Sequence, residues 1–379
     1  MINSLYLKKY FYVFLFINFI FFLEFKHKKI FAEDGIKDKK FKKESNFKEA
    51  MFYEKLKDKK VKCNLCPRGC VLKDGEIGFC RVRQNMEGML YSLNYSKVAA
   101  INIDPIEKKP FFHFLPGTKA FSVACAGCNL RCKYCQNWDI SQRGASDSID
   151  RFLSPKELVD AALKSGAKSI AYTYSEPTVF YEYVIDSAKL AREKGLKNVV
   201  VTSGFINPEP LKELIKYVDA FKIDLKGFNE GFYLKYTSGG LKPVLESLKV
   251  IKNSKRHIEI VNLVIPGAND SEEDIRSVSK WIKENLGPEI PVHFTRFYPN
   301  YLMTQTPPTS KNTLIVARKI AMDEGLKYVY TGNIDNPEGE TTYCPGNKIA
   351  IERRGFFLLK NNLNKGKCPD GTKIYGVFE

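Results

Sequence analysis

The feature that most restricts the fold of this chain is a regular alternation of strand and helix patterns from residue 117 onward. Short apolar runs predict strands, and amphipathic stretches between them predict helices. One helix start is clear, because Ser154, Pro155 and Glu157 form a capping-box signature. The predicted strands are Lys119–Ala124, Ser169–Ser175, Asn198–Ser203, Ala220–Lys226, Ile258–Ile265, Val292–Tyr298 and Tyr328–Thr331.

Repeated strand-helix units with short connections predict an α/β fold. Right-handed crossovers make such strands parallel and curl the sheet into a full or partial barrel. A chain of 379 residues with 44% hydrophobic content can bury a core of this size. We therefore expect functional side chains at the C-terminal ends of the strands.

Three cysteines follow the first of these strands. Cys128, Cys132 and Cys135 form C-x3-C-x2-C, and thiolates this close in sequence can bind one soft metal centre. A structural zinc or an electron-transfer cluster normally has four protein ligands, so three ligands leave one metal position open. Cys125 is a possible fourth thiol, which would make a closed zinc site instead. Thiols that bind no metal are the third interpretation.

Polar residues also end the next two strands. Glu176 places a carboxylate at the active end of the barrel, where it would bind a cationic group or simply cap the following helix. Thr202 and Ser203 end the third strand, and their hydroxyls would contact a ligand or remain solvated.

The fourth strand alternates apolar and charged residues. Phe221, Ile223 and Leu225 lie on one face, which must contact the helices, so Asp224 and Lys226 are predicted to point into the barrel. Contact with a ligand or a purely structural ion pair would explain charges there.

A second cysteine group precedes the barrel. Cys63, Cys66, Cys70 and Cys80 are spaced closely enough to close a four-ligand site. Structural zinc, an auxiliary iron-sulfur cluster and unligated core thiols all remain open for this group. Tight grouping of the ten cysteines favours metal binding over a disulfide framework.

The N-terminus carries an apolar run, Tyr10–Leu23, flanked by lysines. The lysine excess after this run predicts an uncleaved anchor with the protein on the cytoplasmic side of the membrane. An export signal and a misassigned start are the alternatives. Residues 1–62 also hold about half of the net charge of +17, and the remaining lysines are dispersed, which argues against nucleic-acid binding.

The cysteine loop resembles the cluster motif of the radical S-adenosylmethionine (SAM) enzymes, which have an aromatic residue, here Tyr134, before the last cysteine. The segment from Tyr174 to Thr178 is similar to relatives of pyruvate formate-lyase-activating enzyme. The resemblance implies a partial (β/α)6-type TIM barrel in which the three cysteines hold a 4Fe-4S cluster. It further implies reductive cleavage of SAM to a 5'-deoxyadenosyl radical that abstracts hydrogen from a substrate. The implied cofactor-binding residues are Tyr134, Glu176, Thr202, Ser203, Asp224, Lys226 and Val264.

More segments resemble one subgroup, the radical SAM member of the AmmeMemoRadiSam system. They comprise Cys63–Pro67, Lys108–Gly117, His293–Pro299 and Glu338–Pro345. Relatives tend to carry two Cys-Pro-x-Cys pairs at the C-terminus, whereas Cys344 and Cys368 stand alone here. Two thiols make a poor tetrahedral site, so no C-terminal metal is expected.

The same resemblance implies partners. SAM, an electron donor such as flavodoxin or ferredoxin, and a substrate that is a partner protein, a peptide or a small molecule are expected. Lys108, Lys109 and His113 would help to bind that substrate or be solvated in a polar loop. A hypothesis of another class is a non-catalytic, membrane-tethered iron-sulfur or zinc module for electron transfer or binding.

Five parts of the chain are predicted. They are a hydrophobic segment (1–32), a Lys-rich linker (33–60), a four-Cys module (61–108), the barrel (109–335) and a C-terminal extension resembling a degenerate zinc ribbon (336–379).

Overall fold

The computed structural model describes residues 47–145 and 151–379. The chain divides into two units, Met1–Ser45 and Asn46–Glu379, and the described residues belong to the second. The predicted N-terminal segment and the first part of the linker lie outside them. Within the described ranges, no helix has both the length and the apolar character needed to cross a bilayer.

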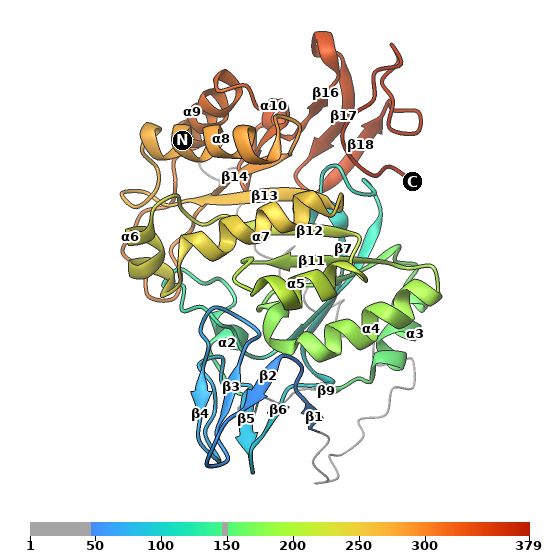
Figure 1. Cartoon of the computed structure of the whole chain (residues 1–379). Helices are drawn as coiled ribbons and strands as arrows, with labels where there is room; N and C mark the ends of the chain where they lie inside the picture. Colours follow the sequence, from blue (N-terminus) through green and yellow to red (C-terminus); the bar gives the residue numbers. More distant parts are fainter. Residues whose placement is uncertain (1–46, 146–150) are drawn as a thin grey trace, which may run out of the picture. The chain divides into compact units, whose positions relative to one another are not determined.

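A nine-stranded sheet forms the centre of the described part (Figure 1). Its strand order is β15-β14-β13-β12-β11-β10-β8-β7-β9. β8 and the strands from β10 to β15 pair in parallel. β7 and β9 are antiparallel additions at one side of the sheet. The bounds are β7 Lys97–Pro105, β8 Lys119–Cys125, β9 Arg151–Phe152, β10 Ser169–Tyr172, β11 Lys197–Thr202, β12 Ala220–Asp224, β13 His257–Val264, β14 Val292–Arg296 and β15 Val329–Gly332.

The parallel order confirms the predicted α/β fold and its partial TIM barrel. All seven predicted strands are present, so the barrel has seven parallel strands where the family pattern implied six. The sheet is open because β15 and β9, at its two ends, do not pair with each other.

Helices cover the outer face of this sheet (Figure 1). The predicted capping box begins α3, with the Ser154 hydroxyl accepting from the Glu157 amide and the Glu157 side chain accepting from the Ser154 amide.

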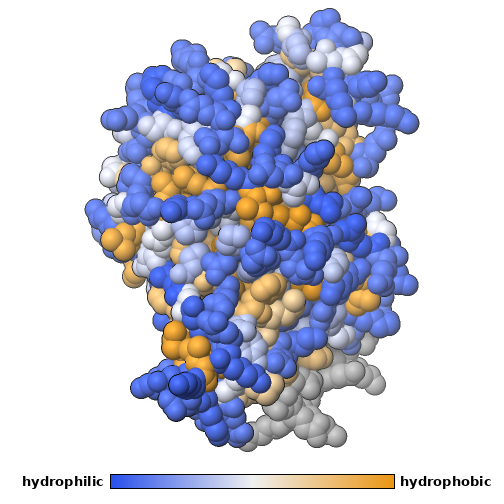
Figure 2. Space-filling model, in the orientation of Figure 1, coloured by the Kyte–Doolittle hydropathy of each residue, from blue (hydrophilic) through white to orange (hydrophobic). Residues whose placement is uncertain are grey.

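Figure 2 shows the face of the molecule on which these helices lie. Hydrophilic side chains predominate there, and apolar ones gather in smaller patches between them. The bounds are α2 Trp138–Ser141, α3 Pro155–Lys164, α4 Tyr181–Glu193, α5 Pro208–Ile215, α6 Glu230–Phe232, α7 Leu241–Asn253, α8 Glu272–Leu286, α9 Lys311–Asp323 and α10 Pro337–Glu340.

The N-terminal end of the barrel is closed by the segment from residue 106 to residue 115, which we call the floor. The strands contribute small inward side chains there, and the floor packs large ones onto them. This separate apolar core consists of Ile106, Phe111, Phe114, Leu115, Ala120, Ala171, Val199 and Ala220. A filled floor leaves the C-terminal ends of the strands as the functional face of the barrel.

A buried carboxylate fixes the floor in place. Glu259 of β13 accepts hydrogen bonds from the backbone amides of Phe112 and His113, at 3.0 and 2.7 Å, and contacts the rings of His257 and His293. His113 is itself buried, and its ring nitrogens lie 2.6 Å from the Tyr375 carbonyl and the Tyr330 hydroxyl. His113 is therefore part of the floor, at the N-terminal ends of the strands. The functional face lies at their C-terminal ends, so the prediction that His113 binds substrate is wrong.

Two small antiparallel sheets precede the barrel. Their orders are β1-β6-β5 and β2-β3-β4. The bounds are β1 Lys48–Glu49, β2 Tyr53–Lys55, β3 Val61–Cys63, β4 Val71–Leu72, β5 Arg83–Met86 and β6 Met89–Ser92. We call residues 47–96 the four-Cys module.

The limits of this module differ from the prediction at both ends. Residues 47–60 were expected to form an unpacked linker, but β1 and β2 pair within the module and Ala50 is buried. Apolar residues between the lysines account for this, because Phe47 and Met51 pack on the core. At the other end, β7 pairs along its length with β8 and so belongs to the barrel sheet.

The module is fixed to helix α4 by polar contacts. Glu182 of α4 forms a fully buried ion pair with Arg83 and accepts the Met51 amide at 2.7 Å. Asp186, one turn further along α4, accepts from Lys48 at 3.0 Å and from the Tyr95 hydroxyl at 2.7 Å. These contacts make the module and the barrel one packed body.

The C-terminal part forms a third small sheet, in the order β16-β17-β18. Its strands are β16 Thr342–Tyr343, β17 Ile349–Arg354 and β18 Phe357–Asn361. Cys344 and Cys368, expected to be two unpaired remnants of a zinc ribbon, are joined by a disulfide across this part. The two sulfurs, which lie far apart in sequence from any other cysteine, are therefore bonded to each other.

Candidate functional site

The three-cysteine loop, residues 126–137, begins where β8 ends and lies against segments from the far side of the barrel. The amides of Arg131 and Lys133 donate to the carbonyls of Thr237 and Tyr236, at 2.8 and 2.9 Å. Asn137 donates to the Tyr174 carbonyl at 2.9 Å, which connects the loop to the end of β10. The loop is thus held between several strand ends, as the barrel rule predicts.

Cys125 lies apart from the other three cysteines. It is the last residue of β8, on the face opposite to Ala120 and its inward neighbours, and it is fully buried. Its thiol acts electrostatically on Tyr183 of α4, in the helix layer. Cys125 therefore points away from the loop, and the closed four-thiol interpretation loses its fourth ligand.

Cys128, Cys132 and Cys135 lie near one another. Burial raises the pKa of the Cys128 thiol well above its usual value, and the nearby Glu176, Cys132 and Cys135 contribute in the same direction. Burial also raises the pKa of Cys132 to about 11, with Lys226 acting against it. The Leu130 amide donates to the Cys128 sulfur at 3.4 Å, and the Cys135 sulfur lies 3.2 Å from the Ser141 hydroxyl.

Glu176 follows β10 and is buried beside this group. One oxygen of its carboxylate accepts from Thr178 and Thr202, and the other accepts from the Ser203 amide and hydroxyl, at 2.9 and 2.7 Å. Glu176 also caps the short helix Pro177–Phe180 through the Thr178 amide. The sequence predicted that the Thr202 and Ser203 hydroxyls either contact a ligand or remain solvated. In the structure they position the Glu176 carboxylate.

Asp224 and Lys226 lie on the barrel side of the site, as the alternation of β12 predicts. Asp224 pairs with Lys222 and, at 3.2 Å, with Lys226. Although burial opposes its ionisation, the two lysines lower the pKa of Asp224. Lys226 in turn lies near Cys132 and Tyr134, which, with Asp224, raise its pKa against the effect of burial. A cation therefore faces the thiols whether or not the pair also has a structural role.

Tyr134 is buried, and its hydroxyl has no hydrogen-bond partner among the described residues. Its ring lies 6.4 Å from that of Phe232, between the cysteine loop and the α6 segment. A buried hydroxyl without a partner costs about 1–3 kcal/mol, so this group has the capacity to bind a polar ligand.

Val264 does not fit its predicted role as well. It ends β13 fully buried, on the same face as Ile258 and Ile260, which pack in the helix-covered core. The register pairs Asp224 with Val261, so Val261 and Leu263 face the barrel interior instead. The predicted side chain differs from those that face inward because the sequence alone does not show the register of β13 against β12.

Lys109, Asp104 and Tyr174 form a polar network inside the barrel that the sequence did not predict. Lys109 is only 3% exposed and donates to Asp104 at 2.6 Å and to the Tyr174 hydroxyl at 2.9 Å. That hydroxyl also donates to Asp104 at 2.7 Å. The expectation of a solvated loop is thus wrong for Lys109, whereas its neighbour Lys108 is half exposed. Only the position of Asp104 near the end of a long apolar strand could have signalled this network.

Three thiols within one loop suit an iron-sulfur cluster, because each thiolate of such a cluster binds a different iron. The residues present, namely three adjacent thiols with Lys226 close to one of them, therefore suit a cluster with one open iron.

The other cysteine group lies next to this loop. Arg68 of the four-Cys module donates to the Asn129 carbonyl at 3.0 Å, and Arg131 of the loop donates to the Phe79 carbonyl. Both guanidinium groups lie over the Phe79 ring, 3.8 and 4.1 Å from its centre. Gly127 is required here, because a Cβ at that position would meet Val82 at 2.7 Å.

Comparison with known proteins agrees with the geometry. The sequence model of the radical SAM superfamily matches residues 123–278, which include the three-cysteine loop and the strands after it. An uncharacterised protein of Methanocaldococcus jannaschii is 49% identical over 318 residues, which cover 84% of this chain and 95% of that protein. The pyruvate formate-lyase-activating enzyme of Clostridium pasteurianum is 28% identical over 174 residues, which cover 44% of this chain and 71% of the enzyme.

Among solved structures, a radical SAM methyltransferase from Sphaerobacter thermophilus is 17% identical, with a TM-score of 0.47 over 58% of this chain and 68% of that one. Together, the sequence match across the cysteine loop and the parallel sheet that places this loop at a strand end identify the protein class. Residues 123–278 of this chain are therefore a radical SAM domain, and the chain is homologous to the pyruvate formate-lyase-activating enzymes.

Proposed function

We propose that this protein uses a 4Fe-4S cluster, held by Cys128, Cys132 and Cys135, to cleave SAM reductively and to abstract hydrogen from a protein or peptide substrate. The observation that carries the proposal is the group of three thiols at the end of β8, with the Glu176 carboxylate beside them at the end of β10. When bound, such a cluster supplies the electron that cleaves SAM to methionine and a 5'-deoxyadenosyl radical.

The chain's own residues would bind and orient SAM. SAM carries a cationic amino group, which the Glu176 carboxylate would attract to the site, with the Thr178, Thr202 or Ser203 hydroxyl giving up its place as a donor. Thr202 and Ser203 hold that carboxylate in one orientation. Lys226 places a positive charge near Cys132, where it offsets the negative charge of thiolates and can meet the SAM carboxylate.

The surroundings of the loop support a large substrate. Trp138 is exposed and stacks on Tyr301, with ring centres 5.4 Å apart, and Leu302 is exposed next to it. The Leu302 amide donates to the Lys133 carbonyl at 2.9 Å, so this apolar rim adjoins the cysteine loop. Exposed apolar side chains grouped around a site favour a protein or peptide surface over a small polar molecule.

Glycyl-radical formation in a partner protein is the first substrate class to test, by analogy with the activating enzymes. Flavodoxin or ferredoxin would supply the electron. Membership of the AmmeMemoRadiSam subgroup and a cytoplasmic location at the membrane are further parts of this proposal. The alternative from another class is a non-catalytic metal module, in which Glu176 serves only as the helix cap that it forms.

The test is anaerobic reconstitution of the full chain with iron and sulfide, followed by incubation with SAM and a strong reductant. Wild type should release 5'-deoxyadenosine, and alanine at any of the three loop cysteines should remove about four irons and abolish the product. Cys125→Ala is the matched control, since Cys125 lies outside the loop, and it should retain iron and activity. A reconstituted wild type that changes oxidation state reversibly but releases no 5'-deoxyadenosine would favour the non-catalytic module.

Substrate class is tested with SAM deuterated at the 5' carbon. Transfer of deuterium from that carbon into a candidate protein, or a radical signal on that protein, supports a protein substrate. Turnover that depends only on small molecules contradicts it.

A further inference from the structure

A cavity near the site is lined by the other cysteine group. It holds about 370 Å³ of space between atoms, part of it open to solvent, and it lies between the four-Cys module and the barrel. Val179 and Asn129 close it from the barrel side, and Asn129 is the neighbour of Cys128. The cysteines that line it are Cys63, Cys66, Cys70 and Cys80.

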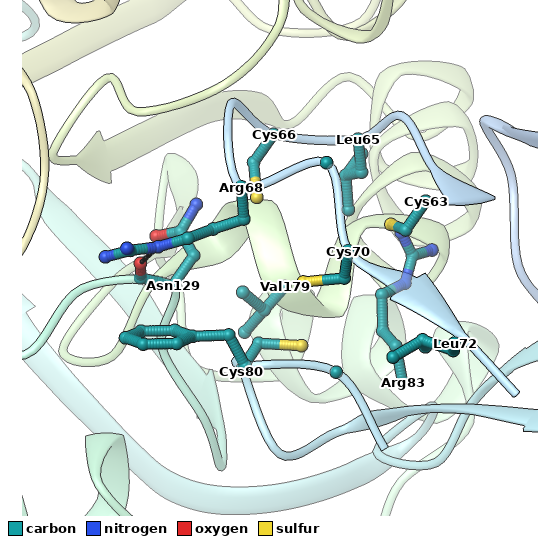
Figure 3. A pocket seen from close by; sticks show the side chains of 13 residues that line it. Cys63, Leu65, Cys66, Arg68, Cys70, Leu72, Cys80, Arg83, Asn129 and Val179 are labelled. Carbon is teal, nitrogen blue, oxygen red and sulfur yellow. Dashed lines mark hydrogen bonds between the residues drawn. The ribbon is translucent and has the colours of Figure 1, made fainter. Parts of the chain in front are cut away.

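All four of these cysteines are outside any disulfide. In Figure 3 the sulfurs of Cys66, Cys70 and Cys80 are directed toward the open space from different sides, and the Cys63 sulfur lies beside the Arg83 guanidinium. The remaining walls are mostly apolar, including Leu65 and Leu72. Several thiols directed at one space form the kind of donor set that soft metal groups bind.

The spacing of the thiols distinguishes one ion from several. A zinc ion holds four sulfurs at about 2.3 Å from itself, and therefore within about 4 Å of one another. Figure 3 shows the sulfurs of Cys66, Cys70 and Cys80 on different sides of the cavity, and the Cys63 sulfur lies farther round, beside Arg83. An iron-sulfur cluster binds each thiolate through a different iron, so it suits sulfurs that are spread around a larger space.

The charges around the cavity also suit an anionic cluster. Arg83 is 2% exposed and donates to the Cys63 sulfur at 3.8 Å, while its other contact is the ion pair with Glu182. Arg68 lines the same cavity and lies within electrostatic reach of Cys66 and Cys70. Two guanidinium groups would offset the negative charge of four thiolates in this partly buried space.

We propose that Cys63, Cys66, Cys70 and Cys80 bind a second 4Fe-4S cluster, next to the first and ligated entirely by the protein. Four protein ligands leave no iron open, so this cluster does not bind SAM. Arg68 and Phe79 of the module contact Arg131 and Asn129 of the loop, so the two cysteine groups belong to segments in direct contact. This proposal stands apart from the proposed reaction, because it concerns a different set of ligands and is tested without turnover.

The test uses the full chain, reconstituted anaerobically, with iron, sulfide and zinc measured per chain. Wild type should bind about eight irons, and both Cys128→Ala/Cys132→Ala/Cys135→Ala and Cys66→Ala/Cys70→Ala should bind about four, a twofold loss in each case. After reduction, the electron paramagnetic resonance signal of the first variant should be unchanged by SAM. The signal of the second variant should change when SAM is added.

Gel filtration and circular dichroism establish that each variant is folded. A folded triple variant that contains about one zinc, or no more than about two irons, overturns the proposal. If the triple variant does not fold, the iron content of wild type is compared with that of Cys66→Ala/Cys70→Ala. Equal iron in these two proteins also overturns the proposal.

Discussion

The ion pair between Arg83 and Glu182 should be one of the most important contacts between the four-Cys module and the barrel. The two side chains are only 2% and 1% exposed. Burial opposes the charge of Arg83, but Glu182 and the thiols of Cys63 and Cys80 raise its pKa, so the guanidinium stays ionised. Glu182→Gln keeps the volume and the acceptor for the Met51 amide and removes only the charge.

The expected effect follows from what remains buried. Without Glu182 the guanidinium is an uncompensated buried charge, which costs about 3–5 kcal/mol of unfolding free energy. With a urea dependence of about 3 kcal/mol per molar, the midpoint should fall by about 1–1.7 M. The measurement is urea unfolding of the metal-free full chain, followed by circular dichroism.

Arg83→Met/Glu182→Gln is the decisive control. Removing both charges should restore most of the lost stability, because buried ion pairs are often replaceable by neutral groups. Glu182→Gln with an unchanged midpoint, or a double variant as unstable as the single one, would refute the argument that the buried charge is responsible.

Two other predictions concern acid stability and location. Burial opposes ionisation of Asp104, but Lys109 and hydrogen bonds lower its pKa to about 2. Because this folded-state pKa lies below the unfolded value, the stabilisation is complete above about pH 4 and is lost as the pH falls to about 2. Asp104→Asn should therefore remove about 2 kcal/mol of the stability change over that interval in acid-dependent urea unfolding, and an unchanged slope would contradict it. Deleting residues 1–32 should move the protein from the membrane to the soluble fraction with SAM cleavage intact, whereas a mature N-terminus at Glu33 outside the cytoplasm would rule out the anchor.

The strands of the barrel were predictable because each is a compact run of residues buried on both faces. Sequence placed β12 as Ala220–Lys226, and the structure ends it at Asp224 with the charged side chains on the predicted inner face. The order of the strands followed from the handedness of their connections. Local pattern and tertiary fold agree here, so local reasoning was sufficient.

Contacts between distant residues were not predictable in the same way. Lys109 resembles a solvated residue because Tyr174, which encloses it together with the nearby Asp104, is 65 residues away in sequence. Residues 47–60 were predicted to be an unpacked linker from their average composition. That prediction is wrong because single apolar side chains such as Phe47 pack on the core. For Val264, the register of β13 against β12 decides which side chains face inward. Register depends on the pairing of two strands, so the sequence of one strand does not show it.

The floor of the barrel has a consequence for how the chain folds. Its residues 106–115 are synthesised before all the parallel strands that they close, and the groups that fix them follow much later. Glu259 is 146 residues beyond His113, and the Tyr375 carbonyl is 262 residues beyond it. Such non-local contacts form late, so Phe111 and Phe114 must remain uncovered while most of the barrel is made. Incomplete chains of this protein should therefore depend on chaperones, and the closing of the floor should be among the last folding events.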